Sequence, residues 1–384
     1  MRTVSPPISN PPSAALEPVP PTLTPVELAE IVGLRPLPCA GLLVMVTRRC
    51  PLSCAHCSSA STMVGDEPDP ATLVEFVGTF ATSNRPEVLL LTGGEPLLRP
   101  DLVVELAGAA RRAGTRVALL TGGYFAARPV PARILRALRA VDHFSLSIDA
   151  FHERQIPRCH LFRLLHLMLD MGTAVSVHAV GSGPADPYLA GLVSQTRQEF
   201  GDRVPMLVNT LRAVGRAAAW SLAGPPVPDH QRVLPCAMAA WPVVAADGTV
   251  LACCNQDGVD RRPVPDHLRL GHIGTDTWPQ VRDRALTSPV LRLIRATGPL
   301  HLRGRYGTPA GRTEHGYCGT CLRLGDHPEI LRAAREVAAG RLGELLDEHA
   351  ARVQFEAGPV ALVRRHGCSR YADLVTLPHR EGSR

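Results

Sequence analysis

The stretch LLVMVTRRCPLSCAHC, residues 42–57, joins a short apolar run to three closely spaced cysteines. Residues 42–46 have the length and apolar composition of a buried strand. Cys50, Cys54 and Cys57 follow at a C-x3-C-x2-C spacing, which does not put three thiols on one face of a regular helix or strand. Thiolates bind zinc, copper(I) and the iron of iron–sulphur clusters. The stretch therefore predicts a strand followed by a loop that wraps around a compact metal group.

Three thiolates are one fewer than a closed structural metal site requires. His56 lies between two of the candidate ligands, where its ring tends to point away from them. A cubane cluster has one more iron than this loop has thiolates. The spare iron would be free to bind a cofactor or a substrate.

The sequence on both sides of this loop alternates between apolar runs and helix-like stretches. The apolar runs are 42–46, 88–91, 117–120, 144–148, 174–180 and 204–208, and the helix-like stretches are 71–83, 101–113, 131–140, 153–171 and 187–200. Such repetition is typical of an α/β protein with a parallel sheet coated by helices. Near-continuous apolar runs fit strands that are buried on both faces.

Two motifs in this region resemble those of radical S-adenosylmethionine (SAM) enzymes. CPLSCAHC, residues 50–57, resembles the three-cysteine signature of that family, and LLLTGGEP, residues 89–96, resembles its GGEP motif after the second strand. The resemblance covers roughly residues 42–215 and implies a partial (β/α)6 TIM-like barrel. Sites on such barrels gather at the carboxyl ends of the strands, where both motifs fall.

The resemblance also implies the cofactors. Cys50, Cys54 and Cys57 would hold a [4Fe–4S] cluster whose spare iron binds the amino and carboxylate groups of SAM. The reduced cluster would cleave SAM to methionine and a 5′-deoxyadenosyl radical, with a flavodoxin- or ferredoxin-type reductant as the electron source. His56 would fill the aromatic position beside the adenine.

The residues of the second motif suit cofactor binding on physical grounds too. Gly93 and Gly94 allow a positive φ and a close approach to the backbone. Glu95 offers a carboxylate to an ammonium group, and in the family Gly93, Gly94, Glu95 and Pro96 would hold the methionyl amine of SAM.

Polar residues after later strands are further candidates for SAM contacts. They are Ser147 and Asp149 after the fourth strand, Arg158 (with Arg154 as its alternative) just beyond, and Asn209 after the sixth. Thr121-Gly122-Gly123 resembles the Thr-Asn-Gly turn of the family, but glycine replaces asparagine. Because a side-chain contact is lost, these three are not predicted to bind SAM.

A second set of cysteines lies beyond residue 211. Cys236, Cys253, Cys318 and Cys321 are enough to close one site, and Cys254 is a spare. The spacing from Gly248 to Cys253 resembles the opening of the SPASM or twitch extension of radical SAM enzymes, which implies one auxiliary [4Fe–4S] cluster. A structural zinc ion and a set of unconnected cysteines remain the alternatives.

Four regions are expected along the chain. Residues 1–38, with ten prolines, are expected to be disordered apart from one helical turn at 26–32. Residues 39–215 form the partial barrel, 216–326 the SPASM/twitch-like region, and 327–384 a helical tail. A hairpin is expected around Asp247-Gly248 and a tight loop at 317–321. One helix is expected from 326 to about 350, with this buried stripe: Leu331, Ala334, Val337, Leu342, Leu345 and Leu346.

Composition narrows the setting. The net charge of +6 from 41 basic residues, all arginine, and 35 acidic ones does not indicate nucleic-acid binding. The sequence has neither a membrane-spanning run nor a signal peptide. We therefore expect a cytoplasmic protein in which clustered cysteines bind metal rather than form disulfides.

Three functions fit these expectations. The first is a radical SAM oxidoreductase that abstracts hydrogen from a peptide during natural-product maturation. Because 38 residues are too few for a leader-binding domain, a separate peptide-recognition protein would help. The second is a dehydrogenase or epimerase of a sugar, aminocyclitol or similar small molecule, with Cys159 as the candidate hydrogen donor of an epimerase. The third is a non-catalytic electron carrier or redox sensor, which would need four protein ligands for each cluster.

Overall fold

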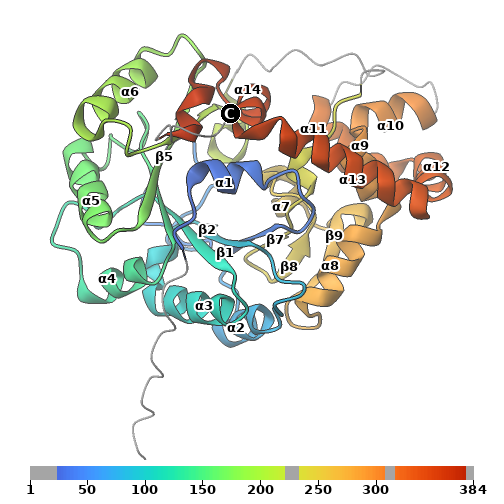
Figure 1. The fold of residues 1–384 in the computed structure, drawn as a ribbon, viewed down its shortest axis with the longest axis horizontal. Coiled ribbons are helices and arrows are strands. Elements are labelled where there is room, and N and C mark those ends of the chain that lie inside the picture. Colours follow the sequence, from blue (N-terminus) through green and yellow to red (C-terminus); the bar gives the residue numbers. More distant parts are fainter. Residues whose placement is uncertain (1–23, 221–232, 308–315, 378–384) are drawn as a thin grey trace, which may run out of the picture.

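The computed structural model describes residues 24–220, 233–307 and 316–377. Six parallel strands form its centre, and they adjoin one another in the order of the sequence (Figure 1). They are β1 Gly41–Thr47, β2 Val88–Gly93, β3 Arg116–Thr121, β4 His143–Ser147, β5 Ala174–Gly181 and β6 Met206–Thr210. The sheet does not close on itself among the described residues, so the prediction of a partial (β/α)6 barrel is confirmed.

Five helices line the outer side of these strands (Figure 1). They are α2 Pro70–Gly78, α3 Pro100–Arg112, α4 Ala132–Arg139, α5 Arg158–Asp170 and α6 Pro187–Phe200. Proline is the first helical residue of α2, α3 and α6, where its missing N–H costs no hydrogen bond. The carboxylates of Asp69 and Asp186 cap α2 and α6 by accepting backbone N–H groups. Apolar side chains of the strands and helices form one continuous core.

The cysteine-rich region extends the same sheet. β7 Val243–Val244 runs parallel to β1, and β8 Thr249–Leu251 and β9 Arg269–His272 follow antiparallel. The expected hairpin is β7–β8, with Gly248 at a φ of +83° in its turn. Trp241 lies so close to β1 that a Cβ at Gly41 would be 2.2 Å from its ring. Short elements here are η3 Ala237–Ala239, α7 Gln256–Asp260 and η4 Asp266–Leu268.

The expectation of disorder over residues 1–38 is wrong for residues 24–38, while residues 1–23 lie outside the described residues. Helix α1, Leu28–Gly33, coincides with the expected helical turn and packs against the C-terminal elements. Val26 is fully buried, and its carbonyl lies 2.8 Å from Nδ1 of His143 on β4. Apolar contacts and this buried polar contact therefore order a proline-rich segment that sequence composition marks as loop.

The C-terminal third is helical. Its elements are α8 Trp278–Thr287, α9 Pro289–Ala296, α10 Pro299–Tyr306, α11 Gly316–Leu322, η5 Leu324–Asp326, α12 Pro328–Ala338, α13 Arg341–Glu356, α14 Gly358–His366 and η6 Ser369–Thr376. The prediction of a tight loop at 317–321 is wrong, because those residues lie in α11. After α14, the N–H of Cys368 donates to the carbonyl of Val208 at 2.8 Å, which ties the tail to β6.

The single helix expected from 326 to about 350 is also wrong, because α12 ends at Ala338 and α13 begins at Arg341. A Cβ at Gly343 would lie 2.3 Å from Ala338, so glycine lets α13 turn back at this point. The buried Arg292 guanidinium donates to the carbonyl of Ala338 at 3.0 Å and stabilises the end of α12. Three leucines of the expected buried stripe are exposed on α13: Leu342, Leu345 and Leu346.

Among the described helices, none combines the length and apolar content needed to cross a bilayer.

Candidate functional site

Three free thiols occupy the loop after β1. Cys54 is buried, and Cys50 and Cys57 are partly buried. Burial raises the pKa of Cys50 to about 12, and the charges of Glu95, Cys57 and Cys54 act in the same direction. Burial also acts to raise the pKa of Cys57, but hydrogen bonds from Ser59 and Ser61 and the nearby Arg216 guanidinium lower it overall. The thiols are thus close enough to influence one another, in a loop that supplies hydrogen-bond donors to sulphur.

The donor chemistry of these thiols suits an iron–sulphur cluster. Tetrahedral zinc, with Zn–S bonds of about 2.3 Å, holds its thiolates about 3.8 Å apart. Within the described residues, the one group of three candidate donors whose ligand atoms all lie within 4.8 Å is His56, Asp149 and His152 rather than a set of thiols. Three soft, partly buried thiolates in one loop match the donor chemistry of an iron–sulphur cluster.

The glycines of GGEP pack directly against the start of the cysteine loop. A Cβ at Gly93 would lie 2.4 Å from the carbonyl oxygen of Thr47, and one at Gly94 would lie 2.3 Å from that of Arg49. The N–H of Gly94 donates to Thr47 at 2.7 Å and that of Glu95 to Arg49 at 2.8 Å. Glycine is therefore required here because two backbones cross, and this crossing fixes the acid beside the thiols.

Glu95 is fully buried at the start of η1, Pro96–Leu98. Its carboxylate accepts hydrogen bonds from the Thr121 hydroxyl at 2.8 and 2.9 Å and from the N–H groups of Leu97 and Gly122, both at 3.0 Å. Burial raises its pKa, although these hydrogen bonds favour the ionised form. A buried acid held mainly by neutral donors is well suited to receive an ammonium group.

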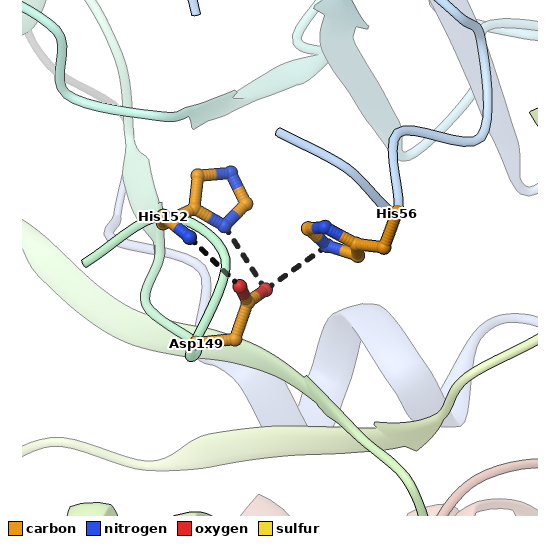
Figure 2. A group of neighbouring side chains, drawn as sticks. All are labelled: His56, Asp149 and His152. Carbon is orange, nitrogen blue, oxygen red and sulfur yellow. Dashed lines mark hydrogen bonds and ion pairs between the residues drawn. The ribbon is translucent and has the colours of Figure 1, made fainter. Parts of the chain in front are cut away.

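Asp149, after β4, gathers two histidines around one carboxylate oxygen (Figure 2). His56 Nε2 lies 3.1 Å and His152 Nδ1 lies 3.0 Å from its Oδ2. The contact between His152 and Asp149 is an ion pair rather than a hydrogen bond, because among the described residues no acceptor lies in the direction of the Nδ1 hydrogen. Burial acts to lower the pKa of His152, but Asp149 and the Cys54 thiol outweigh it and raise the pKa to about 10. Asp149 therefore positions both rings beside the cysteine loop.

An aromatic surface adjoins this group. The His56 ring stacks on Phe151 with centroids 4.4 Å apart, and Trp220 lies 5.6 Å beyond Phe151. Nδ1 of His56 is buried and has no hydrogen-bond partner within the described part of the chain. Stacked rings next to an unused polar atom are a suitable surface for a flat heterocycle.

The remaining residues predicted from the sequence to contact SAM or donate hydrogen do not join the group around Asp149. Asn209 Nδ2 lies 2.7 Å from His178 Nε2, and His178 pairs with Ser147 across β5 and β4, so these residues meet at one strand edge. Arg158 is held by Glu153 at 2.5 and 2.7 Å and by Gln195 at 2.5 Å. Cys159 is exposed on α5.

Several site residues were not found from the sequence. His152 and Phe151 are ordinary residues in an irregular turn, and only the folded chain brings them against His56. Thr121 and Gly122 were set aside because a side-chain amide is missing. The structure shows that the Thr121 hydroxyl and the backbone N–H of Gly122 orient Glu95. The contact from Gly122 comes from the backbone, so it does not depend on which side chain is at that position.

The second cysteine group comes together in space from three parts of the chain. Burial raises the pKa values of Cys236, Cys253 and Cys321, and the charges of neighbouring thiols raise them further. The thiols that exert this effect include Cys318 and Cys254. Arg35 donates to Cys254 Sγ at 3.4 Å and the N–H of Asn255 to Cys253 Sγ at 3.3 Å. Five thiols from distant parts of the sequence therefore lie near one another, and two of them, Cys253 and Cys254, receive hydrogen bonds.

Comparison with known proteins finds similar sequences for part of the first half of the chain. Residues 44–170 match the Radical SAM superfamily. Over 112 residues the chain is 37% identical to the PqqA peptide cyclase of Streptomyces rochei, which covers 29% of this chain and 30% of the relative. Over 108 residues it is 39% identical to the AdoMet-dependent heme synthase of Methanosarcina barkeri, covering 27% and 29%. The chain thus spans about a third of the length of these curated relatives.

Solved structures give more distant matches. SuiB of Streptococcus suis bound to S-adenosylmethionine has 12% identity and a TM-score of 0.45, over 70% of this chain and 75% of that chain. A histidine-tagged form of anSMEcpe with bound AdoMet has 13% identity and a TM-score of 0.46, over 77% and 99%.

The three-thiol loop and the buried GGEP acid both lie within the segment that matches the Radical SAM superfamily. The sequence match places this chain's residues 44–170 in the Radical SAM superfamily.

Proposed function

We propose that this protein is a radical SAM enzyme that abstracts a hydrogen atom from a peptide during maturation of a natural product. The observation that carries the proposal is the backbone crossing of Gly93-Gly94 over residues 47–49. It sets a buried carboxylate close to Cys50, the first thiol of the three-cysteine loop. An electron carrier would need the thiols but not the acid beside them.

Each part of the site has a role in this proposal. Cys50, Cys54 and Cys57 hold a [4Fe–4S] cluster, which when bound supplies the electron that cleaves SAM to a 5′-deoxyadenosyl radical. Glu95 receives the methionyl ammonium, with Gly93, Gly94 and Pro96 shaping its approach. Asp149 orients His56, whose ring would hold the adenine. Ser147, Arg158 and Asn209 remain candidates for the ribose and carboxylate of SAM.

The second cysteine group is proposed to hold an auxiliary [4Fe–4S] cluster on Cys236, Cys253, Cys318 and Cys321. Cys254, which receives a hydrogen bond from Arg35, is the spare thiol. Iron analysis separates this cluster from zinc, because two cubanes require about eight irons per chain and one requires about four. The variant C318A should drop from about eight to about four; a wild-type value near four, with one zinc, would contradict the auxiliary cluster.

A peptide is the favoured substrate because several similar curated proteins are PqqA peptide cyclases. The similarity to an AdoMet-dependent heme synthase and an Fe-coproporphyrin III synthase keeps a small-molecule substrate as the second candidate. Cys159 would be tested as a hydrogen donor only in an epimerase. A flavodoxin- or ferredoxin-type reductant, a separate peptide-recognition protein and a cytoplasmic location complete the proposal.

The decisive experiment uses anaerobically reconstituted protein, reduced with dithionite and mixed with SAM. We expect 5′-deoxyadenosine by mass spectrometry and a change in the EPR spectrum of the reduced cluster when SAM is added. C54A should lose both signals, while C159A should keep both. Protein with a full complement of iron whose EPR spectrum does not respond to SAM would instead be a carrier or sensor.

A further inference from the structure

Gln155 makes two kinds of contact with the cysteine loop from more than a hundred residues away. Its Nε2 donates to Cys54 Sγ at 3.3 Å. Its Oε1 accepts from the backbone N–H of Ser53 at 2.8 Å and from the Ser53 hydroxyl at 3.3 Å. One carboxamide therefore bridges two consecutive residues of the loop.

The orientation of this carboxamide is fixed by chemistry. The Ser53 N–H can only donate, so the Gln155 oxygen must face it, and the NH2 group is left to face the sulphur. A thiolate that ligates a metal is an acceptor, which is the partner that this NH2 group requires. The two contacts are thus mutually consistent in only one orientation of the side chain.

The turn that carries Gln155 is itself well braced. Asp149 Oδ1 accepts the N–H groups of Phe151 at 2.9 Å and His152 at 3.1 Å. The N–H groups of Gln155 and Ile156 then donate to the carbonyl of His152 at 2.9 and 3.0 Å. Ile156 is 4% exposed and anchors the end of the turn in the core. The backbone of Gln155 is therefore held in place by the hydrogen bonds of the turn, which aims its side chain at the cysteine loop.

Hydrogen bonds to cluster sulphurs are one of the main influences on the reduction potential of an iron–sulphur cluster. Donation to a ligating thiolate withdraws electron density and stabilises the reduced form, so it raises the potential. The uncharged Gln155 amide can act in this way without adding a charge to the site.

We propose that Gln155 is a positioning residue that clamps the cysteine loop through Ser53 and raises the reduction potential of the cluster through its hydrogen bond to Cys54. This inference rests on the proposed function, because it requires the cluster on the three-cysteine loop. Gln155 would not itself ligate the cluster. It would affect the reduction potential of the cluster and the order of the loop rather than the cleavage of SAM.

Two variants separate the two effects. Q155L removes both contacts. Q155E keeps the acceptor for the Ser53 N–H but replaces the donor to sulphur with a carboxylate oxygen. Q195L is the matched control, since Gln195 is exposed on α6 and its contact is with Arg158.

The first measurement is an EPR-monitored redox titration of the cluster whose spectrum responds to added SAM. We expect Q155L to lower the equilibrium constant for one-electron reduction about tenfold, which corresponds to about 59 mV. Q155E should lower it further because it adds negative charge, and Q195L should match the wild type. Unchanged potentials in Q155L and Q155E, with normal iron content, would overturn the tuning role.

The second measurement is hydrogen–deuterium exchange at the Ser53 amide, which needs no cluster. Exchange should be at least tenfold faster in Q155L and unchanged in Q155E and Q195L. Equal exchange in Q155L and wild type would overturn the clamp. If Q155L does not fold or does not retain iron, Q155E decides the tuning role. A wild-type protein without a SAM-responsive cluster would refute the proposed function, whereas the Ser53 exchange would still decide the clamp.

Discussion

The hydroxyl of Thr121 donates to the buried carboxylate of Glu95, with oxygen–oxygen distances of 2.8 and 2.9 Å. Thr121 ends β3 and Glu95 follows β2, so neighbouring strands of the sheet hold the donor and the acid together. The contact sets the direction of the acid proposed to receive the SAM ammonium.

Substitution T121V should therefore weaken SAM binding by about one to two powers of ten, because a hydrogen bond to a charged group contributes about 1.5–3 kcal/mol. T121S keeps the hydroxyl and should bind SAM as the wild type does. Equilibrium dialysis of reconstituted protein with labelled SAM measures both. Equal affinity in T121V and T121S would show that the remaining donors orient Glu95 by themselves.

Substitution G94A should disturb two motifs at once. Its Cβ would lie 2.3 Å from the Arg49 carbonyl oxygen, and overpacking of this kind costs about 3 kcal/mol. We expect a lower midpoint of denaturant unfolding and loss of iron from the three-cysteine loop. G108A in α3 is the matched control, since a Cβ there meets nothing within 4 Å. It should be neutral or stabilise the protein by about 0.5–1 kcal/mol, and iron retention in G94A would contradict the crossing model.

His143 should make stability depend on pH. Burial lowers its pKa from 6.5 to about 4, although the contact with Val26 opposes this. The unfolded chain binds a proton on this group below about pH 6.5 while the folded chain stays neutral, so stability is complete above pH 6.5 and is lost as the pH falls toward 4. The full effect is about 3 kcal/mol.

The measurement for His143 is urea unfolding between pH 4 and pH 8, with H143Q for comparison. His178 and His366, whose pKa values burial also lowers to about 4, remain in both proteins. The difference between the two curves therefore isolates His143. Parallel curves would show that His143 does not carry the dependence.

The buried pair Arg295–Asp347 joins α9 to α13, with nitrogen–oxygen distances from 2.5 to 3.1 Å. R295L should destabilise the protein by about 3–5 kcal/mol, because it leaves a buried carboxylate without its partner. R295L/D347L should recover most of that loss. R341A, at an exposed side chain, should change the free energy of unfolding by less than about 1 kcal/mol. Thermal and urea unfolding compare the variants, and a milder effect in R295L than in the double variant would contradict this account.

Features that depend on local sequence were predicted well. The six apolar runs are strands and the stretches between them are helices, because burial on both sides of a parallel sheet leaves a strong apolar signal in the sequence. The β7–β8 hairpin follows from Asp247-Gly248 in the same way. The single long helix expected from 326 was wrong because Gly343 lets α13 pack close to Ala338 and because Arg292, distant in sequence, stabilises the end of α12.

By itself, the sequence determined the parallel α/β order, the three-thiol loop after the first strand and the acid after the second. Those features are set by residue type and short spacing along the chain. Only the tertiary structure decided how Thr121 orients Glu95, how Asp149 gathers His56 and His152, and how Gln155 reaches Cys54. Apart from the Asp149–His152 pair, which lies within one loop, these contacts join segments that follow different strands. Their meeting depends on strand register and packing, which no short stretch of sequence contains.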